Sequence, residues 1–118
     1  MFINFSNHPS SAWEAKQIEV ARRYGEIVDI PFPQVNPENS HQDIEVLADK
    51  YAAMIENMGK ESYTIVHIMG EMTFVFALVS RLKGMGIKCV ASTTERIATE
   101  LEDGTKLSEF SFVNFREY

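Results

Sequence analysis

The chain has 118 residues, of which 45% are hydrophobic and 24% are charged, values typical of one globular domain spanning residues 1–118. Its 17 acidic and 11 basic side chains give a net charge of −6. That charge excludes a general binder of duplex nucleic acid, because such a protein needs a dense field of Lys and Arg. A small anionic ligand, held by a few side chains and helix N-termini, remains compatible with it.

The first part of the chain predicts a strand, a turn and a helix. The apolar residues 2–6 predict the strand, and Pro9 predicts a turn after it. Ser11 and Glu14 have the spacing of a capping box, so we expect a helix from there to Tyr24, where a glycine follows.

The next part predicts a second strand and a second helix. Residues 26–30 predict the strand, and three prolines within residues 31–37 predict an extended linker. Apolar residues then recur at helical spacing between Ser40, a good N-cap, and Gly59. This pattern is typical of an amphipathic helix.

A third strand, a third helix and a fourth strand follow. Residues 63–68 and 87–91 are apolar runs that predict strands, and residues 92–96 are expected to be a polar loop. The segment 72–85 predicts a helix that is apolar almost all round in its first half. Such a helix should be buried on more than one side.

The end of the chain predicts a β-hairpin. Residues 97–101 and 107–115 flank Asp103 and Gly104, a strong two-residue turn signal. Together the elements predict an α/β fold with a mainly parallel sheet in the order 2-1-3-4, three flanking helices and a C-terminal hairpin beyond the fourth strand.

In such a sheet, ligands bind beyond the carboxyl ends of the strands, next to the point where the strand order reverses. Three polar loops leave the first, third and fourth predicted strands at that edge. Two of them open into helices, whose N-terminal amides favour anions, and the third supplies hydroxyls and a guanidinium that suit a phosphate. The candidate residues are Asn7, His8, Ser10, Ser11, Gly70, Glu71, Ser92, Thr93, Thr94 and Arg96.

Most candidates also have an ordinary structural explanation. These explanations are helix capping for Ser10 and Ser11, a turn for Gly70, dipole stabilisation for Glu71, strand propensity for Thr93 and Thr94, and a surface ion pair for Arg96. His8 lies in a polar turn, where a structural and a functional role are equally open. His67 lies within an apolar strand and is interpreted as a buried histidine whose ring nitrogens are satisfied.

Several classes of chemistry lack their hallmarks. The sequence holds no dinucleotide-binding or P-loop glycine motif and no nucleophile-elbow motif. No His, Asp or Glu set has metal spacing, and Cys89 stands alone, so we predict no metal and no cofactor. The longest apolar stretch, Met72–Val79, is far shorter than the roughly 20 residues of a membrane helix, and no signal peptide is visible. We therefore expect a soluble cytoplasmic protein with no membrane partner.

Four short motifs resemble a known family. The segments Asn4–Pro9, His67–Met72, Ala91–Arg96 and Phe112–Tyr118 look like the ligand-edge motifs of small stand-alone CRISPR-associated proteins with Rossmann-like folds, the CARF-like group. Ser-Thr-Thr-Glu-Arg after an apolar strand is the most specific of these motifs.

The resemblance implies a function and an assembly. Proteins of that group are similar to sensor domains for cyclic oligoadenylates, the second messengers of type III CRISPR antiviral defence. They form two-fold homodimers that hold the ring-shaped ligand across the dimer axis, and stand-alone members are often ring nucleases. The resemblance thus implies a metal-independent nuclease that binds cyclic oligoadenylate, with cyclic tetra-adenylate favoured over hexa-adenylate, and that switches the signal off.

The implied chemistry assigns roles to the candidates. The ligand's own 2′-hydroxyl attacks the phosphodiester, so the protein must align the groups, stabilise the phosphorane charge and move protons. His8 is the expected general acid or base and Arg96 the expected phosphate clamp, while Glu71 is expected to contact a base or ribose. The apolar segment Met72–Val79 is the expected dimer interface.

Two alternatives stay open. One is a non-catalytic sponge or sensor for cyclic oligoadenylate, in which His8 only donates a hydrogen bond. The other is an α/β interaction domain without a nucleotide ligand. Product formation separates the first from a nuclease, and ligand-induced stabilisation separates the second.

Overall fold

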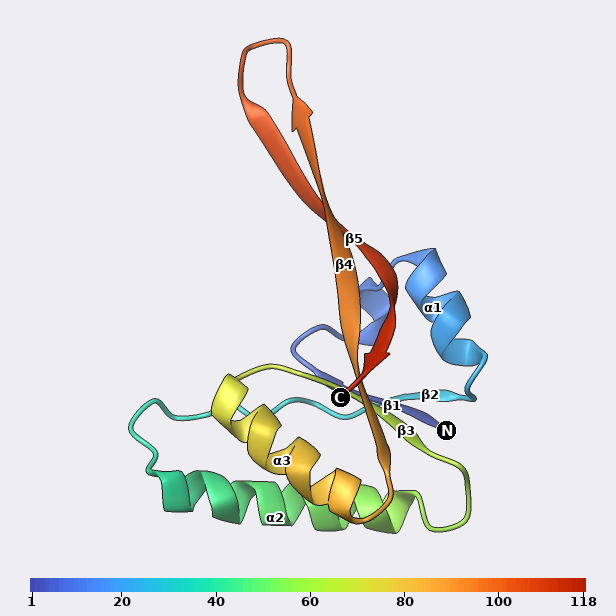
Figure 1. Ribbon diagram of the computed structural model, residues 1–118, viewed down its shortest axis with the longest axis vertical. Coiled ribbons are helices and arrows are strands. Elements are labelled where there is room, and N and C mark those ends of the chain that lie inside the picture. Colours follow the sequence, from blue (N-terminus) through green and yellow to red (C-terminus); the bar gives the residue numbers. More distant parts are fainter.

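The computed structural model describes residues 1–118 as an α/β fold with a five-stranded sheet in the order β2-β1-β3-β4-β5 (Figure 1). β1 to β4 pair in parallel, and β5 pairs antiparallel to β4. The predicted fold class and the order of the first four strands are confirmed. The elements are β1 (Phe2–Ser6), the 3-10 turn η1 (Ser10–Ala12), α1 (Ala15–Arg22), β2 (Ile27–Asp29), α2 (His41–Met58), β3 (Ile65–Met69), α3 (Met72–Gly84), β4 (Lys88–Glu100) and β5 (Lys106–Glu117).

The two faces of the sheet are covered differently. Side chains alternate along β1 and β3, so Ile3, Phe5, Val66 and Ile68 join α2 and α3 in the larger core. The opposite face packs Phe2 and the rest of a smaller apolar cluster against α1, and it also carries the buried polar side chains of β1 and β3. The buried polar side chains of the sheet therefore lie on the face that α1 covers.

The helix α3 is buried on two sides, as its apolar character predicts. Phe74, Val75, Ala77, Leu78, Val79 and Leu82 are buried in the core shared with the sheet and α2. Most of the apolar surface expected to form a dimer interface is thus used inside one chain. Met72 and Phe76 are the exceptions, with 84% and 75% of their surfaces exposed.

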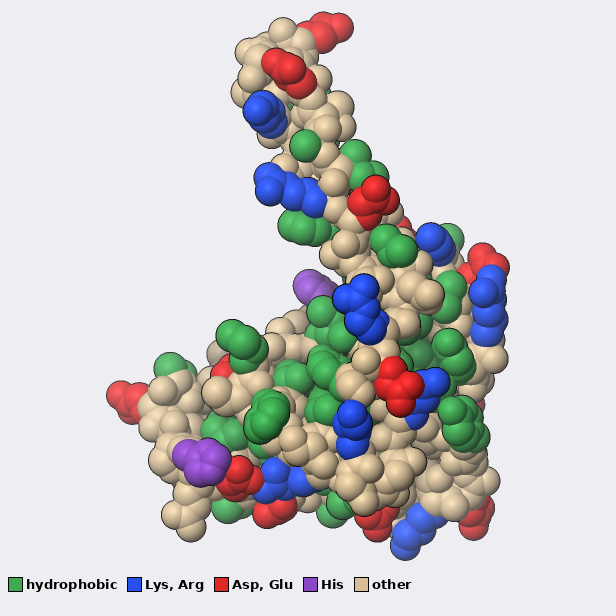
Figure 2. All heavy atoms as spheres, viewed as in Figure 1, with side chains coloured by type: hydrophobic (Ala, Val, Ile, Leu, Met, Phe, Trp, Pro, Cys, Tyr) green, Lys and Arg blue, Asp and Glu red, His purple; other side chains and the backbone are tan.

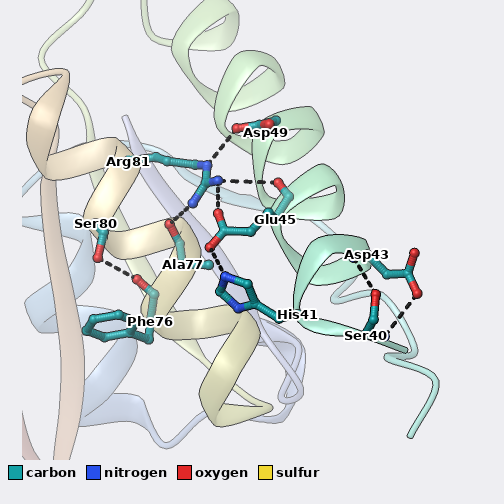
Figure 3. Close-up of polar contacts among 9 residues, drawn as sticks. All are labelled: Ser40, His41, Asp43, Glu45, Asp49, Phe76, Ala77, Ser80 and Arg81. Carbon is teal, nitrogen blue, oxygen red and sulfur yellow. Dashed lines mark hydrogen bonds and ion pairs between the residues drawn. The ribbon is translucent and has the colours of Figure 1, made fainter. Parts of the chain in front are cut away.

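A polar cluster joins α3 to α2 on the outer side of this layer (Figure 3). The Arg81 guanidinium pairs with Asp49 Oδ1 at 2.7 Å and with the Glu45 carboxylate, and these partners raise its pKa. At the start of α2, Ser40 and Asp43 form a complete capping box. The cluster links the two helices, and none of its residues lines a hollow at the carboxyl edge of the sheet.

The fourth strand corrects one prediction. The single strand β4 (Lys88–Glu100) takes in the predicted loop 92–96 and nearly all of the two strands predicted on either side of it. It pairs with β5 from Val90 and Glu117 out to Glu100 and Lys106. The candidate residues of that loop are therefore strand residues. Residues rich in β-branched side chains favour an extended backbone, and β5 supplies the hydrogen-bonding partner that keeps them extended.

The paired ends of β4 and β5 project from the body as a long arm, defined here as residues 94–112 (Figure 1). The predicted position of the turn at Asp103 and Gly104 is confirmed, but the connection is longer than two residues, because β4 ends at Glu100 and β5 begins at Lys106. Gly104 adopts a positive φ of 83°, and Asp103 Oδ1 accepts from the Thr105 amide. The arm makes the molecule elongated, with extents of 52 × 38 × 21 Å.

The predicted capping box at the first helix is wrong. Ser11 lies in η1, and α1 begins only at Ala15 without a side-chain cap. The Glu14 carboxylate instead accepts from the Phe112 amide and the Ser111 hydroxyl, both at 3.3 Å. A tertiary contact with β5 has replaced the local one. None of the helices combines the length and apolar character needed to cross a bilayer.

Gly70 gives a first testable prediction about stability. A Cβ atom placed on Gly70 would clash with the Phe32 ring, which packs against Phe5 and Phe74 with ring centroids 5.1 and 5.4 Å away. Gly70→Ala should therefore destabilise the fold by about 1–3 kcal/mol, the usual cost of overpacking. Urea unfolding measures this. Gly84→Ala is the matched control, because a Cβ atom placed there would have no neighbour within 4 Å, and equal stability of the two variants would contradict the account.

Candidate functional site

A cleft of about 440 Å³ lies at the carboxyl ends of β1 and β3, on the α1 face of the sheet. It collects residues from both halves of the chain, including Thr94 and Phe110 of the arm. The lining residues are Ser6, His8, Ala12, Trp13, Glu14, Gln17, His67, Met69, Ser92, Thr94 and Phe110. Three of the ten predicted site residues, His8, Ser92 and Thr94, therefore meet in one cavity.

Two smaller hollows flank the cleft. Asn7 lines one of about 300 Å³ that shares Ser6 with the cleft, and Gly70 lines another of about 390 Å³ that shares Met69. Asn7 and Gly70 thus lie beside the cleft and not in it. The carboxyl edge of the sheet is a row of three adjoining depressions.

The remaining predicted residues have other partners. The Ser10 hydroxyl donates to Asp29 Oδ2 at 2.6 Å, and Ser11 is exposed outside the cleft. The Thr93 hydroxyl bonds the Asn114 carbonyl at 3.0 Å, across the ladder to β5. These three residues make no direct contribution to the cleft.

Glu71 caps α3 and fills the anion site expected there. Its carboxylate accepts from the Phe74 amide at 2.8 Å and from the Thr73 amide at 3.1 Å. These hydrogen bonds hold the pKa of Glu71 below its ordinary value. The first amides of α3 are thus occupied by a carboxylate of the same chain, and a phosphate would have to displace it.

Arg96 lies on the arm, next to the cleft but not among the residues that line it. It pairs across the ladder with Phe110, which lines the cleft, so both side chains are on the same face of the arm. Its guanidinium turns towards the tip, where it donates to the Ser108 hydroxyl at 2.9 Å. No Lys or Arg side chain lines the cleft itself.

A row of polar side chains crosses the sheet beneath the cleft, and sequence reasoning did not connect its members. Asp29, Asn4 and His67 occupy the same register level on β2, β1 and β3. Asn4 Nδ2 donates to Asp29 Oδ1 at 2.7 Å, and Asn4 Oδ1 lies 2.9 Å from His67 Nδ1. His67 Nε2 lies 2.6 Å from Ser92 Oγ in the cleft. His67 is 2% exposed and hydrogen-bonded at both nitrogens, as predicted.

One signal could have revealed the row. Asn4 and His67 each lie two residues before the end of a buried, otherwise largely apolar strand, and Asp29 is the last residue of β2. A single polar residue in one buried strand is usually explained by local packing. Three at one register level in adjacent strands indicate a polar network.

Burial and hydrogen bonding determine the protonation of the two titratable groups in the row, His67 and Asp29. Desolvation, and secondarily the charge of His8, lowers the pKa of His67 to about 4, so its imidazole is neutral at physiological pH. Trp13 and Phe115 each pack edge-on to the ring, with centroids 5.3 Å away. Burial raises the pKa of Asp29, but hydrogen bonds from Ser10 and Asn4 outweigh it and hold that pKa below its ordinary value.

Trp13 connects the row to His8. Its indole Nε1 donates to the His8 backbone carbonyl at 3.1 Å, and Asn4 Nδ2 donates to the same carbonyl at 2.8 Å. The backbone at His8 is thus fixed, while its exposed imidazole lines the cleft. No group of three or more His, Cys, Asp or Glu side chains is arranged to hold a metal ion.

The fold and this site define an α/β protein with a mostly parallel sheet, a cleft at its carboxyl edge and a projecting antiparallel arm. A family model described as the Uncharacterized protein MJ1673 family matches residues 1–116, and the chain therefore belongs to that family. No curated protein and no solved structure matches the chain.

Proposed function

We propose that the protein is a cytoplasmic ring nuclease of the CARF-like group, which binds cyclic oligoadenylate in the cleft and cleaves it without a metal ion. One observation carries the proposal: His8, Ser92 and Thr94, from distant parts of the chain, line one cavity at the edge where an α/β sheet binds ligands. The resemblance of the motifs around these residues to that group supplies the ligand class.

The lining of the cleft suits a nucleotide. Trp13 and Phe110 offer aromatic surfaces on which adenine can stack, with Phe110 67% exposed. Gln17, Ser92 and Thr94 supply hydrogen-bonding groups for phosphate and ribose oxygens. Metal-free cleavage then requires the ribose 2′-hydroxyl to lie in line with the leaving oxygen.

His8 is the proposed general acid. Its imidazole lines the cleft and has no hydrogen-bonding side-chain partner in the chain, so it is free to meet a leaving 5′-oxygen. Cleavage by the 2′-hydroxyl leaves a linear product that ends in a 2′,3′-cyclic phosphate. Arg96 lies on the arm, paired with the cleft residue Phe110, and its positive charge is proposed to stabilise the negative charge of the phosphate.

We propose that the active form is a homodimer held by an apolar patch, defined here as Met69, Met72, Phe76 and Tyr118. These side chains line one hollow, and each is 37% exposed or more. Figure 2 shows hydrophobic side chains gathered over α3 and the base of the arm. Met69 also lines the cleft, so a two-fold axis through the patch would bring two clefts together around one ring.

The arm supplies a second reason to expect a partner chain. Its exposed hydrophobic side chains are Ile97, Leu101, Leu107 and Phe110. A two-stranded ribbon is at best marginally stable on its own in water. Contact with a second subunit would bury part of this apolar surface.

The direct test is incubation with a small excess of cyclic tetra-adenylate in the presence of a chelator, followed by chromatography of the products. The proposal predicts linear oligoadenylates with 2′,3′-cyclic phosphate ends, formed faster than from cyclic hexa-adenylate. His8→Ala should slow cleavage by about 100-fold or more, as expected for loss of a general acid, and change binding less. An intact ring after hours, despite tight binding, would identify a sponge instead.

An interaction domain is the second candidate, and one observation favours it. Glu14 lines the cleft, Asp29 lines the hollow beside it, and no cationic side chain lines the cleft. Such a surface attracts a polyanion less than it attracts a basic peptide. If no cyclic oligoadenylate raises the melting temperature, the interaction domain replaces the nuclease.

A further inference from the structure

A series of hydrogen bonds runs across the sheet from Asp29 on β2 to the hydroxyl of Ser92 on β4. The links are Asp29 to Asn4 at 2.7 Å, Asn4 to His67 at 2.9 Å, and His67 to Ser92 at 2.6 Å. Asn4 and His67 are 1% and 2% exposed, whereas Ser92 opens onto the cleft. The series therefore connects a buried network to the cavity through one hydroxyl.

The donor and the acceptor of each hydrogen bond in this series can be assigned from the groups that can only accept. Asn4 must turn its NH₂ group towards the Asp29 carboxylate and the His8 carbonyl, because neither can donate. Its oxygen then faces His67 Nδ1, which must carry the hydrogen. In a neutral imidazole the other nitrogen is an acceptor, so Ser92 donates its hydrogen to His67 Nε2.

This arrangement leaves the Ser92 oxygen as an acceptor in the cleft. Gln17 Nε2 lies 3.2 Å away and donates to one lone pair. The other lone pair is open to a hydroxyl of a bound ligand. The Ser92 hydroxyl donates its hydrogen to a histidine while its oxygen faces the cavity. Such a hydroxyl can accept a proton from a ligand and donate its own proton to the histidine.

We propose that Ser92 and His67 form the relay that removes the proton from the attacking ribose 2′-hydroxyl; this inference rests on the proposed function. The 2′-hydroxyl gives its proton to Ser92 Oγ, and Ser92 passes its own proton to His67 Nε2. The 2′-oxygen forms a bond to phosphorus, the bond from phosphorus to the 5′-oxygen breaks, and His8 gives that oxygen a proton. Solvent then restores His67 and His8 to their starting states.

The relay assigns different roles to its members. Ser92 touches the substrate and is the catalytic residue. His67 accepts the proton through Ser92, and Asn4 is a positioning residue that fixes the tautomer of His67. Burial of His67 between Trp13 and Phe115 keeps its ring in place and its acceptor nitrogen free.

The test compares single-turnover cleavage of cyclic tetra-adenylate by full-length variants. Ser92→Ala removes the relay hydroxyl and should slow cleavage at least 100-fold, with ligand affinity within about fivefold of the original. Ser92→Thr keeps a hydroxyl on a strand that favours β-branched residues and should recover cleavage to within about tenfold. Ser80→Ala on the exposed side of α3 is the matched control and should cleave normally.

A pH profile tests the part played by His67. Because the resting imidazole of His67 is protonated only near pH 4, it stays neutral and able to act as the base at pH 5, so the wild-type rate should fall less than twofold from pH 7 to pH 5. An ordinary imidazole acting as the base, with a pKa near 6.5, would lose about 25-fold over that range. Circular dichroism at pH 5 verifies that the chain is folded.

The outcomes separate the relay from the proposed function. Cleavage by the wild type that survives in Ser92→Ala, or that falls more than tenfold by pH 5, overturns the relay and leaves the nuclease standing. A wild type that makes no product overturns both. Loss of cleavage in Ser92→Ala with recovery in Ser92→Thr, and a wild-type rate that falls less than twofold by pH 5, supports the relay.

Discussion

Replacing Phe76 with glutamate should convert the proposed dimer into a monomer. Phe76 is 75% exposed and lines the apolar patch together with Met72, which is 84% exposed. In a two-fold interface each substitution occurs twice, so Phe76→Glu would place two carboxylates in an apolar contact. Removing them from water costs several kcal/mol unless they find partners, enough to weaken association at least 100-fold.

Analytical ultracentrifugation of the full chain at about 10 μM measures the effect. Val46→Glu is the matched control, because Val46 is a 63% exposed hydrophobic residue of α2 outside the patch. It should leave the dimer intact. A wild type that sediments as a monomer contradicts the dimer, and a Phe76→Glu variant that stays dimeric moves the interface to the arm.

Acid should destabilise the fold through His67. In the folded chain the pKa of this imidazole is about 4, whereas in the unfolded chain it is near 6.5. Above pH 6.5 both states are neutral and the histidine has no effect on stability. Between pH 6.5 and 4 only the unfolded state binds the proton, so the free energy of unfolding falls as the pH falls, by about 3 kcal/mol in all.

Urea unfolding between pH 7.5 and 4 measures this loss. Other titratable groups lie near His67: His8 and Glu14 line the same cleft, and Asp29 is linked to His67 by Asn4. A variant of His67 is therefore needed to isolate the contribution of this one group. His67→Gln should reduce the pH dependence by about 3 kcal/mol, whereas His41→Gln, an exposed change on α2, should leave it unaltered. Equal pH dependence in His67→Gln and wild type would show that His67 stays accessible to protons.

The sheet order was predictable because the alternation of strands and helices leaves few ways to connect them. Right-handed crossovers place the strand of residues 65–69 beside β1, and the apolar runs mark the buried strands. The Asp103 and Gly104 turn was also predictable, because a positive φ at Gly104 needs no tertiary support.

The arm and the first helix were not predictable in the same way. Residues 92–96 contain polar and β-branched residues that suit a loop or a strand equally well, and only pairing with β5 decides between them. Ser11 and Glu14 fit a local capping box, but Glu14 gains a contact with β5 at Phe112 that no local pattern contains. In both places a distant strand overrides the local preference.

The candidate site was predicted in place but not in full. His8, Ser92 and Thr94 were identified because polar residues at the carboxyl edge of a parallel sheet point to a ligand site. Asn4 and His67 were passed over, because a polar residue inside an apolar strand is usually satisfied locally. Their significance depends on the register that aligns them with Asp29, and a sequence pattern carries no register.

The most direct measurement of the proposed site uses Trp13, the single tryptophan of the chain, which lines the cleft. Its indole Nε1 donates to the His8 carbonyl at 3.1 Å, so a ligand stacked in the cleft must alter its surroundings. Titration with cyclic tetra-adenylate should shift the indole resonance and change the fluorescence in a saturable way, with one ring bound per two chains. An unchanged indole resonance at ligand concentrations that saturate binding elsewhere, or no binding at all, would contradict the account.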